Sequence, residues 1–271
     1  MEFKNILIIA VVIIIIYLLY LWLFKDTTNK YIVQTTLKGN SGQTVLANTL
    51  PNGGTSLNYS YTFWIYINDY NQNYGEKKII LDRHSDLPGS SQDAVSTSSQ
   101  HTPLIYLGAN KNDLMVHISD TTQGKNKTTL VEDNDPKVED IPLQKWCFIA
   151  VSLDSRVLDI YLDGKLVTSH YYDNLLKAPK QNDKIDINQS SSADIKTNGS
   201  NSDISKSGWA GILSNVEYFD RSLNAREVYE RYRSGFTGAG GILGGLGEDV
   251  SKFNMKVSFL QDDKEVSQFK I

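Results

Sequence analysis

Cysteine, proline and methionine are scarce in this chain, with one, six and three residues among 271. The single cysteine, Cys147, excludes an intramolecular disulfide and any zinc site built from several cysteines. Because disulfides are common in secreted adhesion domains, their absence slightly favours a reducing compartment. Basic residues are not in excess either, since 27 Lys and Arg stand against 31 Asp and Glu. We therefore expect no nucleic-acid partner, which would need a basic face.

One long apolar run is present, at the N-terminus. Residues 6–24 contain no charge, glycine or proline, and a helix of that length crosses the hydrocarbon core of a bilayer. The run ends in Trp22, Phe24 and Lys25, which is typical of a membrane interface and not of a signal-peptide cleavage site. We therefore predict a short flank (1–5), an uncleaved single-pass transmembrane helix (6–24) and a spacer (25–30).

The side of the membrane on which the rest of the chain lies is left open by the flanking charges. Lys4 precedes the run and Lys25 and Lys30 follow it, and so small a difference is weak support for either orientation. Two locations for the C-terminal part therefore stay possible: a cell surface, and a virion or internal membrane.

From residue 31 onward the pattern is typical of β-strands. Segments such as residues 59–69, YSYTFWIYIND, alternate and are rich in aromatic and β-branched residues. Long Ser- and Asn-rich loops separate them, and helical periodicity is nearly absent. These features predict an antiparallel β-sandwich.

A hairpin is expected at residues 157–167, VLDIYLDGKLV. Asp163 and Gly164 form the dipeptide that suits a type I′ turn, in which both central residues take positive φ. A two-residue turn places Ile160 opposite Val167.

One helix follows the last strand, in residues 221–235, RSLNAREVYERYRSG. Asn224 is a good N-cap and Glu227 completes a capping box, while Leu223 and Val228 form a hydrophobic staple. Gly235 is expected to end the helix.

Three motifs in this order resemble a known family: Thr62-Phe63-Trp64, the strand led by Trp146 with IYLDGKLV, and the closing GWAGILSNVEYFD with its helix. Residues 31–235 resemble the laminin-G-like jelly roll of the concanavalin A-like lectin/glucanase superfamily. The resemblance implies an all-β fold of two packed antiparallel sheets and structural roles for Trp64, Trp146, Trp209 and Gly211. It implies no activity, because the fold serves lectins, glycanases and structural domains alike.

The family pattern ends at Gly235. Residues 236–252 are Gly-rich and are predicted to be a flexible linker. Residues 253–271 alternate again, which predicts a hairpin-like tail that adds a strand to a partner or packs on its own sandwich.

Catalytic motifs are not found. Retaining glycanases of this superfamily carry paired carboxylates on one strand, and this sequence has no such run. Its four histidines lie in different segments, and no GxSxG, HExxH or P-loop motif occurs. Cys147, within an apolar strand, is expected to be buried and inert. We therefore predict that the protein is not an enzyme.

Residues that would hold a ligand are less clearly marked. No cofactor is expected, although Ca²⁺ is bound by loop oxygens in many relatives, and the candidate ligands are Asp82, Asp86, Asn112, Asp113 and Asp120. Tyr70 and Tyr74, in the loop NDYNQNYGE, suit contacts with a sugar or a protein partner.

The sequence thus favours a non-catalytic, membrane-anchored recognition or adhesion module that binds a glycan or a protein. The alternative is a structural membrane protein of a large DNA virus particle or a similar assembly. The third hypothesis is a glycoside hydrolase with an unrecognised site.

Overall fold

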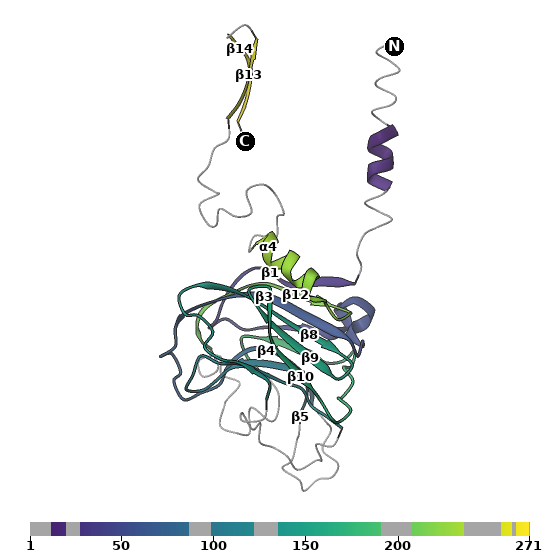
Figure 1. The fold of residues 1–271 in the computed structure, drawn as a ribbon, viewed down its shortest axis with the longest axis vertical. Helices are drawn as coiled ribbons and strands as arrows, with labels where there is room; N and C mark the ends of the chain where they lie inside the picture. Colours follow the sequence, from purple (N-terminus) through teal and green to yellow (C-terminus); the bar gives the residue numbers. More distant parts are fainter. Residues whose placement is uncertain are drawn as a thin grey trace.

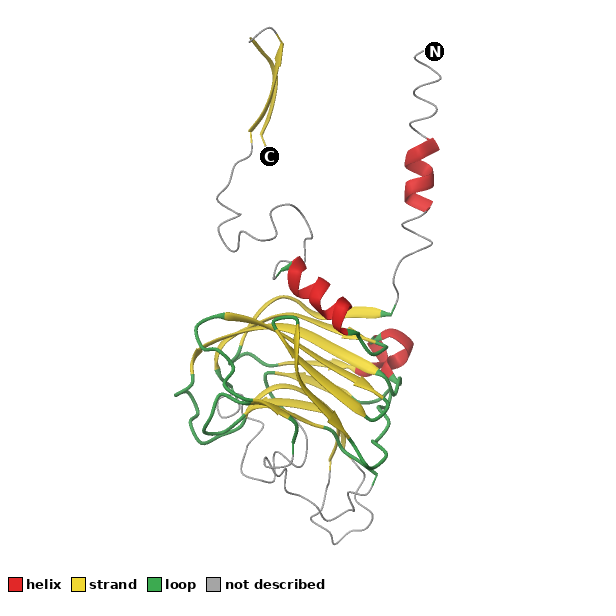
Figure 2. Ribbon diagram, viewed as in Figure 1, coloured by secondary structure: helices red, strands yellow, loops and turns green. Residues whose placement is uncertain are grey.

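Two six-stranded sheets make up most of the described structure (Figures 1 and 2). The computed structural model describes residues 12–19, 28–86, 99–121, 135–190, 208–235, 256–261 and 264–270. Neighbouring strands within both sheets pair antiparallel. The predicted all-β, two-sheet antiparallel sandwich is therefore confirmed.

We call the sheets A and B and give their strands in spatial order. Sheet A consists of β1 (Asn29–Lys38), β12 (Ala210–Phe219), β3 (Tyr59–Asp69), β8 (Trp146–Asp154), β9 (Val157–Leu162) and β10 (Lys165–Tyr171). Sheet B consists of β2 (Gln43–Leu46), β11 (Lys184–Ile187), β4 (Lys78–Asp86), β5 (Ser99–Leu107), β6 (Leu114–His117) and β7 (Lys137–Val138). Two short 3-10 helices, η1 (Ala47–Thr49) and η2 (Pro51–Gly54), lie between β2 and β3 in the chain.

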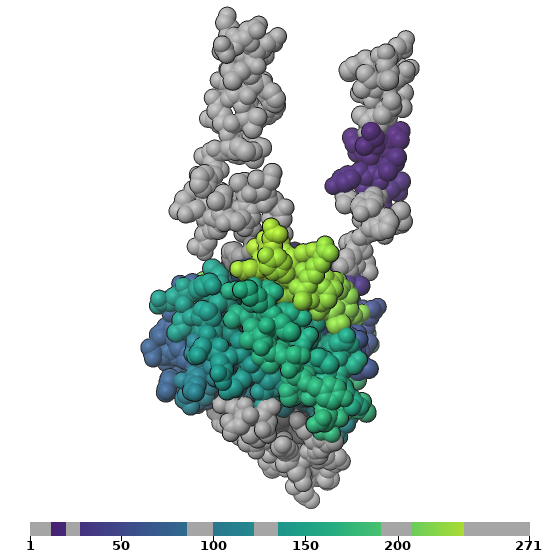
Figure 3. All heavy atoms as spheres, in the orientation of Figure 1, coloured from purple at the N-terminus to yellow at the C-terminus, as the bar shows by residue number. Residues whose placement is uncertain are grey.

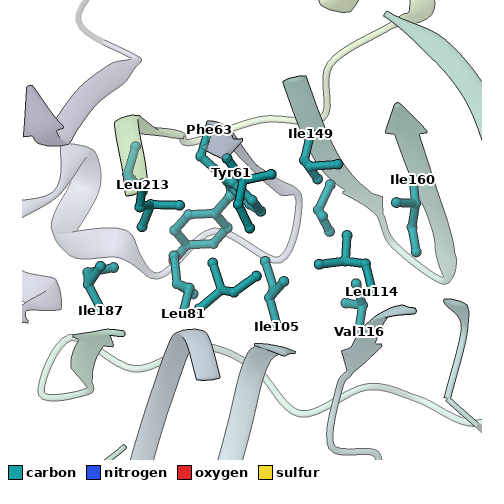
Figure 4. Packing of buried hydrophobic residues seen from close by; sticks show 14 of the residues in the cluster. Tyr61, Phe63, Leu81, Ile105, Leu114, Val116, Ile149, Ile160, Ile187 and Leu213 are labelled. Atoms are coloured by element: carbon teal, nitrogen blue, oxygen red, sulfur yellow. The ribbon is translucent and has the colours of Figure 1, made fainter. Parts of the chain in front are cut away.

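Alternating apolar residues build the core between the two sheets. Because successive residues of a strand point to opposite faces, Tyr61 and Phe63 of β3 point inward together. They meet Leu81 of β4, Ile105 of β5 and Leu213 of β12 (Figure 4). The apolar surface buried here is the main source of the stability of the sandwich.

The hairpin of β9 and β10 has the expected turn but a different register. Asp163 and Gly164 have φ values of 49° and 77°, as a type I′ turn requires. Ile160 pairs with Thr168, not with Val167 as predicted, because the register shifts between Leu166 and Thr168. Such a bulge bends an edge strand, and the Thr168 hydroxyl donates to Lys137 O of β7 at 2.8 Å.

Helix α4 (Ala225–Ser234) lies across sheet A and forms part of the molecular surface (Figures 1 and 3). Its capping box is present: Asn224 Oδ1 accepts from the Glu227 N–H at 3.0 Å, and Glu227 Oε2 accepts from the Asn224 N–H at 3.0 Å. The helix covers a second apolar cluster, in which the ring of Tyr232 stacks on that of Trp64 at 5.9 Å.

Both ends of the chain carry separate elements. Residues 12–19 form a helix of exposed apolar residues, but in the part of the chain that the structure describes no helix is long and apolar enough to cross a bilayer. The structure therefore does not support the predicted transmembrane helix, whose residues 6–11 and 20–24 lie outside the described ranges. The predicted linker, residues 236–252, lies outside them as well.

The C-terminal strands β13 (Lys256–Gln261) and β14 (Lys264–Lys270) pair antiparallel with each other and form a sheet of their own. These two strands are labelled in Figure 1.

Candidate functional site

The outer face of sheet B carries a group of buried ionisable side chains. Leu81, Ile105 and Val116 point into the core between the sheets. Their chain neighbours Asp82 and His117 therefore point the other way, and both are nevertheless buried.

Three histidines form a row on this face. His84, His101 and His117 lie on the adjacent strands β4, β5 and β6, with ring centroids 6.5 Å and 6.0 Å apart along the row. The sequence places these histidines in different segments, and the fold brings three of them into one row. Strand pairing brings them together, because His84 lies opposite His101 and His117 lies opposite Leu104.

Each imidazole of the row contacts its own carboxylate. The pairs are His101 Nδ1 with Asp82 Oδ1 at 2.7 Å, His117 Nδ1 with Asp135 Oδ1 at 2.8 Å, and His84 Nε2 with Asp186 Oδ2 at 3.2 Å. Buried ionic groups of this kind persist only when paired, since an uncompensated charge in the interior is strongly unfavourable. The row is therefore a buried network in which each imidazole is paired with a carboxylate.

Asp82 is held in its ionised form. Burial alone raises the pKa of this carboxyl. The charge and hydrogen bond of His101, the charge of His84 and the hydrogen bond from Ser190 together lower it by more, so the pKa of Asp82 lies below its ordinary value. Ser190 donates its hydroxyl proton to Asp82 Oδ2, whereas activation of a serine nucleophile directs that proton to an imidazole.

Asp82 and Asp186 lie opposite each other on β4 and β11, so two carboxylates do meet on this face. A retaining glycosidase needs one such group protonated, with a raised pKa. The pKa of Asp82 is lowered instead, and Asp186 accepts a hydrogen bond from Thr44 at 2.5 Å. The pair therefore resembles a structural network more than an acid and a nucleophile.

An open polar hollow of about 280 Å³ lies at the other end of the same face. Its lining residues come from the loop between β5 and β6 and from the strands beside it: Gly108, Ala109, Asn110, Lys111, Asp113, Met115 and Lys137. Tyr106, paired with Met115, donates to Asp135 Oδ2 at 2.9 Å and so connects the hollow to the histidine row. Lys77 Nζ lies 5.0 Å from the centre of the Tyr106 ring.

The loop of residues 70–77 supports the hollow. The Tyr70 hydroxyl contacts Gly108 O and Lys111 O, and the Tyr70 ring lies under Lys78 Nζ at 4.3 Å. The Tyr70 hydroxyl therefore supports the loop, and the role of Tyr70 as a contact residue for a sugar or a protein partner stays a prediction. Tyr74 is 65 % exposed.

Tyr74 also lies beside the hollow. The N–H of the next residue, Gly75, donates to Ala109 O at 3.0 Å, and Ala109 lines the hollow.

Charges of both signs surround the hollow. Lys137 pairs with Glu139 at 2.8 Å in an exposed position, and Asp113 Oδ1 accepts from the Asp140 N–H at 3.1 Å. Ammonium, amide, carboxylate and main-chain groups thus line one small cavity, which suits a polar ligand with several hydrogen-bonding groups.

The candidate calcium ligands do not converge. Asp82 belongs to the histidine row, and the Asn112 amide donates to Ile141 O at 2.7 Å. Asp120 accepts from Asn174 at 3.1 Å, and the side chain of Asp86 lies outside the described residues. Among the residues described, no group of three or more His, Cys, Asp or Glu is suited to a metal ion.

The residues to which the sequence assigns structural roles lie in packed surroundings. Trp209 is buried and Trp64 nearly so, and the Trp146 ring lies 5.6 Å from that of Tyr66. A Cβ on Gly211 would lie 2.1 Å from Tyr66 O, so only glycine fits there.

Comparison with known proteins agrees with this fold. A laminin-G family model described as the concanavalin A-like lectin/glucanases superfamily matches residues 38–229. The search of curated proteins found no match.

Similar solved structures include the botulinum neurotoxin type G receptor-binding domain (18% identity, TM-score 0.44, 77% of this chain and 44% of that chain). The binding domain of botulinum neurotoxin DC in complex with rat synaptotagmin II is another (16%, 0.45, 76% and 46%). A Trypanosoma rangeli sialidase is a third (12%, 0.46, 76% and 28%).

This chain spans less than half the length of those structures. The family model, by contrast, covers most of this chain. The chain therefore belongs to the concanavalin A-like lectin/glucanase superfamily.

Proposed function

We propose that the protein is a non-catalytic recognition module that binds a glycan or a protein ligand at the hollow beside Lys111 and Lys137. The observation that carries the proposal is the composition of that hollow, where ammonium, amide and carboxylate groups surround about 280 Å³. A volume near the lower end of ligand sites fits one small polar group. The exposed Tyr74 ring beside it supplies a surface for stacking. These features favour a sugar residue over a large apolar ligand.

The absence of catalysis is part of the proposal. The paired carboxylates Asp82 and Asp186 are each held by an imidazole, and the lowered pKa of Asp82 is opposite to what a general acid needs. The buried histidine row serves stability in this proposal.

A glycan array probed with the full chain, solubilised in detergent, tests the proposal. Lys111→Ala and Lys137→Ala are expected to abolish binding, whereas Lys38→Ala, an exposed lysine on β1, is expected to retain it. Turnover of an oligosaccharide that is lost in Asp82→Asn or Asp186→Asn, with the fold intact, would contradict the proposal.

We also propose that the N-terminal run anchors the module in a membrane. Support comes from the apolar sequence of residues 6–24 and from the exposure of every residue in helix 12–19. Alkaline carbonate extraction of membranes is expected to leave the full chain in the pellet and to release a chain lacking residues 1–27. Release of the full chain would contradict the anchor.

The second candidate function is a structural membrane component of a virus particle or similar assembly. The observation that favours it is the open apolar edge of β10, where Leu166, Val167 and Tyr171 are exposed.

A further inference from the structure

Lys78, the first residue of β4, has a buried side chain, with 1 % of the residue exposed. Lysine is rarely buried to this extent, because its ammonium loses the hydration that stabilises the charge. Burial accordingly lowers the pKa of Lys78 below its ordinary value of 10.5, and the charge of Glu76 opposes this. A buried ammonium needs acceptors for its three N–H groups.

Three main-chain carbonyls supply these acceptors. Lys78 Nζ donates to Asn73 O at 3.2 Å and to Glu76 O at 3.3 Å, both in the loop of residues 70–77. It also donates to Ala109 O at 3.5 Å, in the loop between β5 and β6. Because Ala109 lines the hollow, the ammonium joins the wall of the hollow to a loop that is distant in the sequence.

The Tyr70 side chain makes a second link between the same two loops. Its ring lies 4.3 Å from Lys78 Nζ, which is a cation–π contact. Its hydroxyl contacts Gly108 O and Lys111 O. Gly108, Ala109 and Lys111 all line the hollow. Lys78 and Tyr70 together therefore hold three main-chain carbonyls of its wall.

Contacts from outside the 70–77 loop fix its shape. Asn73 has a φ of 52°, which is uncommon for a residue other than glycine. Its carbonyl accepts from Lys78, and its side-chain amide donates to Gly208 O at 2.7 Å. The N–H of Gly75 donates to Ala109 O at 3.0 Å, so the same carbonyl receives hydrogen bonds from Gly75 and Lys78. Loss of one of these contacts is therefore expected to loosen the loop without unfolding the sheets.

We propose that Lys78 is the positioning residue of the hollow, and that its ammonium fixes the two loops in the arrangement that accepts a ligand. The inference rests on the function proposed above for the hollow. Lys78 is buried and does not line the hollow, so it acts through the carbonyl of Ala109. A wall that is fixed before binding avoids the entropic cost of ordering loops when the ligand binds.

Hydrogen–deuterium exchange of the full chain in detergent tests the positioning without any ligand. Lys78→Met keeps a side chain of similar length and removes the charge. The Gly75 amide is then expected to exchange about tenfold faster, the usual effect of losing a hydrogen bond to a charged group, while the amides of β3 and β8 stay unchanged. Lys184→Met, at an exposed position on β11, is the matched control. Unchanged exchange at Gly75 in Lys78→Met would overturn the proposal.

Rescue by an added amine separates a positioning role from a purely structural one. On a glycan array, Lys78→Ala is expected to bind about tenfold more weakly than the wild-type chain. Propylammonium chloride, whose cation replaces the missing part of the side chain, is expected to restore binding, whereas the neutral 1-propanol is not. Equal rescue by 1-propanol would overturn the proposal, and so would full binding by Lys78→Ala with a lowered melting temperature.

The two experiments also distinguish this proposal from the function on which it rests. A wild-type chain that binds no glycan, combined with faster exchange at Gly75 in Lys78→Met, would count against the proposed function and not against the role of Lys78 in holding the loops.

Discussion

His101 Nδ1 lies 2.7 Å from Oδ1 of Asp82, and both side chains are almost completely buried, at 1 % and 0 % exposure. The two residues come from β4 and β5 and are 19 positions apart in the chain. This contact is the central link of the histidine row, and it makes the row sensitive to the loss of a single charge.

Asp82→Asn is expected to destabilise the fold by about 3–5 kcal/mol, because it leaves His101 without its carboxylate in a buried position. Urea denaturation of the full chain measures the change. Asp173→Asn, at an exposed position, is the matched control and is expected to change the free energy of unfolding by less than about 0.5 kcal/mol. Equal stability of the two variants would show that the network is not required for folding.

The stability of the fold is expected to fall in acid. The pKa of Asp82 is lower in the folded state than its ordinary value of 3.8, so folding favours the ionised form. The contribution is fully present above about pH 4 and is lost as the pH falls through the folded-state pKa. Denaturation from pH 7 to pH 2 measures it, and the acid-dependent loss is expected to be smaller in Asp82→Asn.

Substitutions at Gly164 and Gly75 distinguish the cost of backbone strain from the cost of a steric clash. Gly164 and Gly75 both have positive φ, 77° and 86°, so alanine at either position is unfavourable by roughly 1–2 kcal/mol. A Cβ on Gly164 would also lie 3.1 Å from the rings of Tyr229 and Tyr232, whereas a Cβ on Gly75 meets nothing within 4 Å. Gly164→Ala is therefore expected to lower the melting temperature more than Gly75→Ala, and the reverse order would contradict this account.

Cys147 is expected to be unreactive in the folded protein. Burial, together with the charge of Asp163, raises the pKa of its thiol to about 11. Because the thiolate is the reactive form, a thiol reagent at pH 8 is expected to label the chain only after urea is added. Rapid labelling of the native chain would show that this strand opens.

The local elements of this protein follow from local sequence. Asp163-Gly164 requires a turn with positive φ wherever it lies, and Asn224 with Glu227 forms its capping box within a single turn of helix. The alternation in residues 59–69 is enough to predict a strand with one face in the core. Physical causes that act within a few residues, such as steric limits on φ and hydrogen bonds at helix ends, can be predicted without knowing the fold.

The histidine row and the hollow depend on tertiary structure. Each histidine lies at an apolar strand run, which is a signal visible in the sequence. Only the strand order β11-β4-β5-β6, however, brings neighbouring rings of the row to 6.5 Å and 6.0 Å from each other. The strand register at Val167 also depends on tertiary structure, because the bulge there accompanies a contact between Thr168 and a strand of the other sheet. Sequence alone determined which residues are extended, turned or capped, whereas long-range pairing decided which polar groups meet, because that choice depends on the packing of the whole sandwich.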